Sequence, residues 1–200
     1  MPNVLRGPGE FEFEEKRLRF IGRCRSIETE EDARNYINEI RSLHKDASHN
    51  VYAYGLTNES ITDYTRHSDD GEPKGTAGLP VLNVFTKNKI INFVCVVTRY
   101  FGGTLLSAGG LTRAYSRAAK GAAEAAGFEP LIVIVRYKIN FHYSKLSQIQ
   151  YFCEKNEIVI ENINYAGDCE IIFSMPERLE KIFLQNAGLY TREPPLRLAP

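Results

Sequence analysis

Apolar residues recur every three to four positions in parts of the chain, and this spacing predicts amphipathic helices. Residues 26–45, SIETEEDARNYINEIRSLHK, carry their apolar residues on one helical face. Thr29 stands where it can cap the first turn of that helix. A second helix is expected over residues 77–87, with Thr76 as its cap.

A continuous apolar run, INFVCVVTRYF at residues 91–101, has the length and β-branched content of a strand buried on both faces. The loop GGTLLSAGG follows it and leads to a third helix over residues 111–126. Many alanines in this helix favour close packing on a sheet, and Gly127 is the residue expected to end it.

The remaining pattern before Gly127 predicts further strands and two irregular stretches. Strands are expected over residues 11–24, with a bend near residues 15–17, and over a segment that starts at HNVYAY and ends at Gly55. Residues 1–10 are expected to be a loose lead-in, and residues 61–78 a long polar segment with little regular structure.

The composition changes near Pro130, which predicts a domain boundary between residues 1–129 and 130–200. The second part gives the order βαββα: a strand over residues 131–141, a helix over 144–156, strands over 157–165 and 169–175, and a helix over 176–188. The tail LYTREPPLRLAP is a poor candidate for the last strand of a ferredoxin-like βαββα(β) domain, because its adjacent prolines lack backbone donors, and it is expected to be an edge strand or a disordered end. The fold class expected is α+β, with two domains.

Charge and cysteine usage narrow the classes of partner and site. Lys plus Arg and Asp plus Glu both number 25, so no net charge draws the chain to nucleic acid or to a membrane. The four cysteines lack the spacing of a zinc site, and no cofactor or metal is expected. The N-terminus lacks the apolar core of a signal peptide and the apolar runs are short, so we expect a cytoplasmic protein without a membrane partner.

One candidate site is SDDGEPKGTAG, residues 68–78, which we call the acidic segment. Its carboxylates at Asp69, Asp70 and Glu72 suit a divalent cation or a shared proton. The alternative is an acidic turn whose side chains bind its own backbone. His49 or His67, next to Asp69, has the chemistry of a base with its orienting carboxylate, but a histidine at a strand end is more often a structural residue that makes hydrogen bonds.

A second candidate site is RYFGGTLLSAGGLTRAY, residues 99–115, which we call the glycine-rich segment. Backbone amides at a helix start attract anions, and Arg99 and Arg113 supply positive charge for a phosphate. The alternative is a tight strand-to-helix crossover in which the glycines serve the backbone alone. The spacing matches neither a dinucleotide-binding nor a Walker loop.

Four fragments follow one another in the first part of the chain: HNVYAY, SDDGEPKGTAGLP, VVTRYFGGTLL and AGGLTRAY. Together they resemble the signature of the YigZ/IMPACT family over nearly all of residues 11–127. The resemblance implies an N-terminal domain of the kind shared by a small-subunit ribosomal protein, domain four of elongation factor G and the GHMP kinases. For bacterial members it implies a C-terminal ferredoxin-like domain. Its eukaryotic members act by protein contact in the control of translation initiation under starvation.

The resemblance brings no catalytic assignment, but it marks motif positions as candidates for ligand binding. These are His49, Asn50, Asp69, Asp70, Glu72, Gly75, Thr76, Arg99, Gly102, Gly103, Gly109, Gly110 and Arg113. The chain departs from the commonest pattern at Val51, where cysteine is usual, and at Ser107, where glycine is usual. The serine would crowd an anion in the loop.

Two hypotheses for function remain open, and both require the acidic and glycine-rich segments to fold against each other. The first is a regulatory protein that binds RNA, the ribosome or a translation-factor protein through this groove. Its second domain would offer strand aromatics, Tyr137, Phe141 and Phe173, to stacked bases, unless these side chains form the core. The second hypothesis is an enzyme or binder for a phosphate-bearing small molecule, for which only fold analogy speaks.

Overall fold

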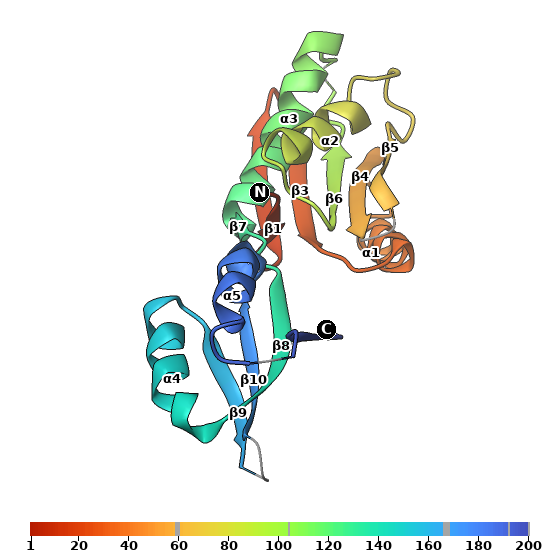
Figure 1. Cartoon of the computed structure of the whole chain (residues 1–200). Helices are drawn as coiled ribbons and strands as arrows, with labels where there is room; N and C mark the ends of the chain where they lie inside the picture. The colour runs from red at the N-terminus through yellow and green to blue at the C-terminus, as the bar shows by residue number, and fades with distance from the viewer. Residues whose placement is uncertain (59–60, 104, 166–168, 192, 200) are drawn as a thin grey trace. The chain divides into compact units, whose positions relative to one another are not determined.

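The computed structural model describes residues 1–58, 61–103, 105–165, 169–191 and 193–199. The chain divides into two compact units, Met1–Leu131 and Ile132–Pro200, each with a hydrophobic core of its own (Figure 1). Both units mix helices with strands, which confirms the α+β class and the two-domain layout. The first unit ends at Leu131 because β7 (Phe128–Pro130) pairs with the N-terminal strand β1 (Asn3–Leu5).

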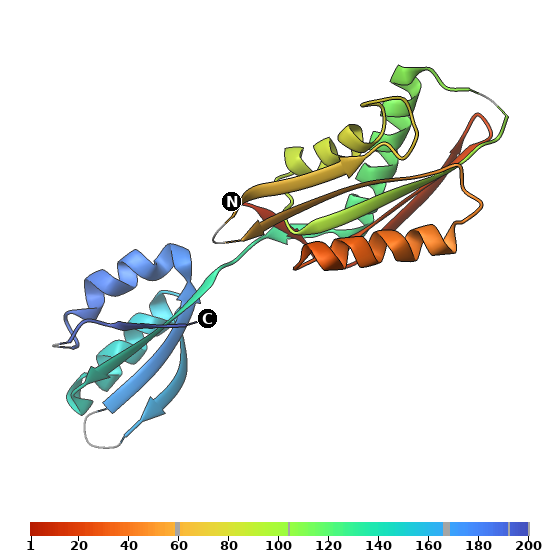
Figure 2. The same cartoon turned by 90° about the vertical axis from the view of Figure 1, so that its right-hand side faces the viewer.

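An antiparallel sheet covered by helices makes up most of the first unit. Its strands are β2 (Gly9–Glu15), β3 (Leu18–Ser26), β4 (His49–Asn58), β5 (Ile61–Ser68) and β6 (Phe93–Tyr100). Its helices are α1 (Glu30–Leu43), α2 (Gly78–Lys87) and α3 (Ala108–Ala126). In the described part of the chain the strand order is β2-β3-β6-β4-β5. Helices α2 and α3 lie on one face of the sheet and α1 lies on the other (Figure 2).

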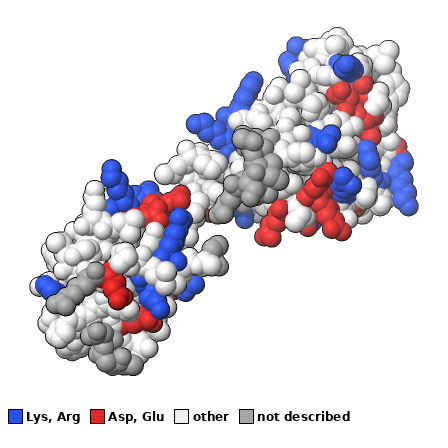
Figure 3. Space-filling view, turned by 45° about the vertical axis from the view of Figure 1, so that its right-hand side comes forward, with Lys and Arg blue, Asp and Glu red and all other residues white. Residues whose placement is uncertain are grey.

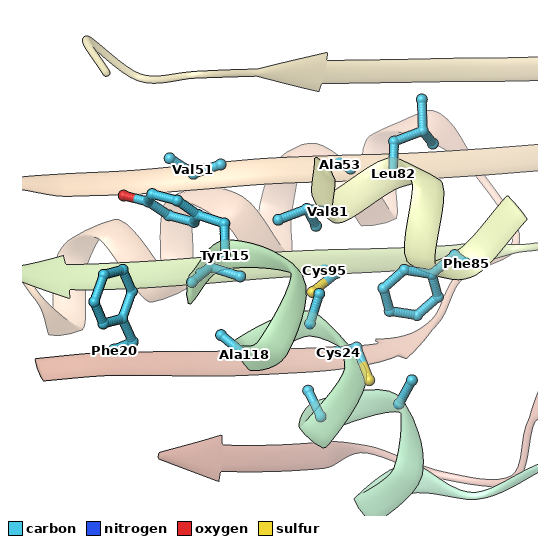
Figure 4. Packing of buried hydrophobic residues seen from close by; sticks show 14 of the residues in the cluster. Phe20, Cys24, Val51, Ala53, Val81, Leu82, Phe85, Cys95, Tyr115 and Ala118 are labelled. Carbon is cyan, nitrogen blue, oxygen red and sulfur yellow. The ribbon is translucent and has the colours of Figure 1, made fainter. Parts of the chain in front are cut away.

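Strand β6 is the central strand of this sheet, and both of its faces are buried, as its apolar run predicts. Cys95 and Val97 face α2 and α3, whereas Val94 and Val96 face α1. Figure 4 shows the α2/α3 side of this core, where Tyr115 of α3 lies near Phe20 and Val51 of the sheet. The alternation along β6 therefore assigns each neighbouring residue to one face, including Arg99 to the α2/α3 side.

The caps of α1 and α2 differ in how well the sequence predicts them. Thr29 caps α1 as expected: it accepts a hydrogen bond from the Asp32 amide, and the Asp32 carboxylate accepts one from the Thr29 amide. The cap expected at Thr76 is wrong. The Thr76 hydroxyl donates to the Pro73 carbonyl oxygen at 2.7 Å, and α2 begins at Gly78 without a cap from its neighbouring side chain.

Four expectations about strands need correction. The bend near residues 15–17 is a complete chain reversal, in which Lys16 and Arg17 have positive φ and join β2 to β3 in a hairpin. Residues 61–68 form the edge strand β5. Its many polar residues obscure the alternation of apolar and polar positions that predicts a strand. The N-terminal lead-in contains β1, and the strand that starts at His49 continues past Gly55.

The second unit has an antiparallel sheet with helices on one face. Its strands are β8 (Ile134–Phe141), β9 (Val159–Asn164), β10 (Cys169–Pro176) and β11 (Leu196–Leu198), and its α-helices are α4 (Leu146–Lys155) and α5 (Glu180–Ala187). In the described residues the strand order is β11-β8-β10-β9. The tail forms the last strand, at the edge of the sheet, because Pro194 and Pro195 come before β11 and leave its own backbone amides free to pair with β8.

The aromatic residues of this second sheet belong to the core. Tyr137, Phe141 and Phe173 are all buried against α4 and α5, so they are not available for stacking on bases. On the face drawn in Figure 3, acidic and basic side chains are interspersed over both units. Within the described ranges, no helix has both the length and the apolar character needed to cross a membrane.

Candidate functional site

Asp69 organises the acidic segment from within. Its carboxylate accepts hydrogen bonds from the amides of Gly75 at 2.8 Å, Ala77 at 3.1 Å and Gly78 at 2.8 Å. Burial acts to raise the pKa of Asp69, but these three amides outweigh burial and lower its pKa below the usual value. Asp69 thus stabilises the start of α2 in place of Thr76, and its oxygens are occupied.

Asp70 ties the acidic segment to the sheet and to α1. Its carboxylate accepts from the Asn50 amide at 2.7 Å and from Arg41 at 2.6 Å. Its carbonyl oxygen accepts from Nδ1 of His49 at 2.7 Å. The residue sits at φ 47°, which costs backbone energy that these contacts offset. Asp70 therefore serves to hold the segment in place.

Glu72 is the buried centre of the acidic segment. Its Oε1 accepts hydrogen bonds from Arg99 of β6 and, at 2.6 Å, from the Tyr115 hydroxyl of α3. The side chains of Glu72 and Arg99 are only 3% and 6% exposed. Burial, followed by the bond to Glu72, raises the pKa of Tyr115, so this hydroxyl stays protonated and donates. A loop, a strand and a helix thus meet at one carboxylate oxygen.

The acidic and glycine-rich segments share one cavity of about 390 Å³. Its lining consists of Ser48, His49, Glu72, Pro73, Arg99, Phe101, Leu105, Leu106 and Leu111. Ser48 directly precedes β4, the other polar residues come from β4, β6 and the acidic segment, and the leucines come from the glycine-rich segment. The two segments therefore do meet, as both functional hypotheses require.

Several glycines of the glycine-rich segment have structural reasons to be there. A Cβ on Gly102 would lie 1.6 Å from the Arg17 carbonyl oxygen in the β2–β3 turn, and Gly103 adopts φ 86°. Ser107 caps α3 by accepting from the Gly110 amide at 3.3 Å. The segment is therefore largely a tight crossover, with one of its helix-start amides already taken.

The candidate residues fall into several groups. His49, Glu72 and Arg99 line the cavity, whereas the carboxylate of Asp70 binds the Asn50 amide and Arg41 of α1. Asp69, Gly75 and Thr76 shape the turn before α2, and Gly102 and Gly103 shape the turn after β6. Gly109, Gly110 and the exposed Arg113 lie in the first turns of α3.

The structure favours the structural role of His49 over a base that pairs with Asp69. His49 bonds to the backbone of Asp70, and His67 lies exposed on β5 while amides occupy the Asp69 oxygens. Among the residues described, no group of three or more His, Cys, Asp or Glu side chains is placed to hold a metal ion. The four cysteines are buried and free, and burial raises the pKa of Cys24 to about 12.

The motif residues did not point to the apolar part of the cavity. Phe101 and Leu105 are exposed, at 54% and 83%, and they stand at its edge with Leu106. The signal for them was present in the sequence, because a loop of glycines and small residues contains the apolar letters F and LL. Apolar side chains in such a loop cannot all enter a core, and here two of them stay exposed at the cavity.

Comparison with known proteins gives a consistent result. Residues 16–123 match the Impact N-terminal domain, and residues 139–184 match a domain of unknown function, DUF1949. The chain is 32% identical over 181 residues to the IMPACT family member YvyE of Bacillus subtilis, covering 90% of this chain and 82% of that protein. It is 30% identical over 161 residues to YigZ of Escherichia coli, covering 80% and 79%.

A crystal structure of a hypothetical protein has the same fold, with a TM-score of 0.63 and 26% sequence identity over 100% of this chain and 98% of that one. The domain match covers more than half of the chain, and the relatives match across most of both lengths. The motif order along the first unit led to the same family. The chain belongs to the IMPACT family.

Proposed function

We propose that this protein is a cytoplasmic regulatory binding protein of translation, which contacts its partner through the cavity between the acidic and glycine-rich segments. The partner is RNA, the ribosome or a translation-factor protein. Family membership supports the link to translation, because the resemblance implies that eukaryotic members act there through protein contacts. The structure supports binding over chemistry.

The observation that carries this proposal is the contrast between occupied acids and exposed apolar side chains. Asp69, Asp70 and Glu72 each have internal partners that hold their carboxylates in place. Phe101 and Leu105, beside them, are exposed at the cavity edge. A general acid or base needs access to its substrate, whereas an exposed apolar edge around a polar floor is typical of a binding surface.

The test is co-sedimentation of the whole protein with ribosomes, using Leu105→Ser and Phe101→Ser as variants. Leu43→Ser is the matched control, because Leu43 is also an exposed apolar residue, at 66%, but lies at the end of α1. We expect the wild type and Leu43→Ser to sediment with ribosomes and the two cavity variants to stay in the supernatant. Equal behaviour of all four proteins would count against the proposal.

A phosphate-bearing ligand is the second candidate, and the placement of Arg113 favours it. A Cβ on Gly109 would lie 3.7 Å from a terminal nitrogen of Arg113, so this exposed cation lies beside the start of α3. Thermal shift with inorganic phosphate and pyrophosphate tests this candidate. A shift that is lost in Arg113→Ala supports it, and no shift with either anion rejects it.

A further inference from the structure

The floor of the cavity carries little net charge, which limits the ligands that it suits. Arg99 is the buried cation in its lining, and its guanidinium is paired with Glu72 in the same lining. A phosphate or carboxylate placed beside Arg99 would meet the Glu72 carboxylate as well, and in a site of low dielectric this repulsion offsets the attraction. The cavity therefore favours a neutral polar group.

The floor also has one hydrogen-bond donor and one acceptor that lack protein partners. The Nε–H of Arg99 is buried and has no acceptor in the described part of the chain. The Asp70 carbonyl oxygen can only accept, so Nδ1 of His49 donates to it, and in this tautomer the ring carries its lone pair on Nε2. That Nε2 lies 3.9 Å from Oε1 of Glu72, beyond hydrogen-bond distance.

Phe101 is the aromatic neighbour of Arg99 in the cavity lining. The Phe101 ring centroid lies 6.0 Å from Cζ of Arg99, and Phe101 is more than half exposed. Because so much of the ring is already in water, turning it away from Arg99 changes its buried apolar area little and therefore costs little free energy. A partner that moves this ring outward can accept a hydrogen bond from the buried Nε–H of Arg99. Without the partner this donor stays unsatisfied, which costs free energy.

A group that accepts one hydrogen bond and donates another, without charge, is a carboxamide. The apolar edge formed by Phe101, Leu105 and Leu106 suits apolar residues on either side of that group. From the donor, the acceptor, the neutral floor and the apolar edge, we infer that the cavity binds an Asn or Gln side chain on an apolar polypeptide segment. This inference rests on the proposed binding function and selects a polypeptide over nucleic acid as what occupies the cavity.

The test uses four probes on the whole, 15N-labelled protein, with binding measured from shifts of backbone amide signals. Two are the peptides acetyl-Leu-Gln-Leu-amide and acetyl-Leu-Glu-Leu-amide. A third, acetyl-Leu-Met-Leu-amide, has a side chain of similar length without the carboxamide. The fourth is a uridine hexanucleotide, which is anionic and represents RNA.

We expect the glutamine peptide to shift the signals of His49, Phe101 and Leu106, and to bind at least about tenfold more tightly than the glutamate or methionine peptide, since a mismatched polar group costs on the order of one tenfold step or more. Leu105→Ser should weaken binding of the glutamine peptide by about fivefold, because the variant loses the apolar contact that Leu105 makes with the bound peptide. Leu43→Ser should leave its affinity unchanged. Leu105 is so exposed that its replacement does not threaten the fold.

Three results would overturn the inference: no shift with the glutamine peptide, equal or tighter binding of the glutamate or methionine peptide, or displacement of the glutamine peptide by the hexanucleotide. Ribosome co-sedimentation is a separate measurement on the same variants. Peptide binding without ribosome binding keeps the carboxamide site and rejects the ribosome as the partner in the proposed function. Ribosome binding without peptide binding rejects only the carboxamide site.

Discussion

The Tyr115 hydroxyl donates a hydrogen bond of 2.6 Å to Oε1 of Glu72, although the two residues are 43 positions apart in the chain. Both side chains are buried, and the same oxygen accepts from Arg99. Because each of the three belongs to a different element, this contact fixes α3, β6 and the acidic segment relative to one another. The cavity keeps its shape for the same reason.

Removing that hydroxyl tests its contribution to stability. Tyr115→Phe leaves the buried Glu72 carboxylate with one donor fewer, so we expect the free energy of unfolding to fall by about 1–3 kcal/mol. Urea unfolding of the whole protein followed by circular dichroism measures the change. Tyr64→Phe is the control, because the Tyr64 hydroxyl donates a longer bond of 3.4 Å to Glu30 and accepts one of 2.8 Å from Arg66 at an exposed position, where water can replace it, so its loss should change little. Equal effects of both substitutions would contradict this account.

The Glu72–Arg99 pair should show the asymmetry of buried ion pairs. Glu72→Gln leaves the Arg99 charge buried without its counter-charge, and we expect a loss of roughly 3–5 kcal/mol in unfolding free energy. The double variant Glu72→Met, Arg99→Met removes both charges and should be more stable than Glu72→Gln. The comparison is made by thermal unfolding. A double variant less stable than the single one would show that the pair itself stabilises the fold.

Asp69 should make the first unit sensitive to acid. Its folded pKa lies below the usual 3.8, so its contribution to stability is complete above pH 3.8 and is lost as pH falls through the folded value. In Asp69→Asn this part of the pH dependence is absent. The prediction is tested by measuring the unfolding free energy of both proteins from about pH 6 to about pH 2, which is roughly the range over which such carboxylates titrate. Parallel curves for the two proteins would refute it.

Two glycines of the glycine-rich segment should respond in opposite ways to alanine. Gly102→Ala places a methyl group against the Arg17 carbonyl oxygen and should lower the melting temperature. Gly109→Ala meets only an ordinary contact within α3, where alanine is the better helix former, and should raise stability by about 0.5–1 kcal/mol. A Gly109→Ala protein that is stable but no longer binds phosphate would instead favour the anion site.

The sequence predicted those elements whose pattern carries a strong period. The α1 helix and its Thr29 cap follow from apolar spacing and capping chemistry, and β6 follows from its apolar run. Strand β5 was missed because it is an edge strand with exposed Thr65, Arg66 and His67, so its alternation is weak. The reversal at Lys16 was missed because neither turn residue is Gly or Asn, which usually mark such turns.

The candidate site was predictable in its location but not in its contacts. The acidic and glycine-rich segments are both polar and both adjoin buried elements. This arrangement and the family resemblance indicated that the two segments meet. The pairing of Glu72 with Arg99 and Tyr115 depends on sheet register, which sets His49 opposite Arg99 and Phe20 beside it. No local sequence pattern determines the register between strands that are far apart in the chain, so these partners could be identified only from the structure.

The place of β6 between β3 and β4 has a consequence for folding on the ribosome. Both neighbouring strands are synthesised before β6, so the β2–β3 and β4–β5 hairpins each keep an unpaired edge until residue 100 has emerged. The N-terminal β1 stays unpaired for longer still, until its partner β7 at residues 128–130 has been synthesised. A pause in synthesis before either point would leave the nascent chain with open strand edges, which are prone to pair with other chains.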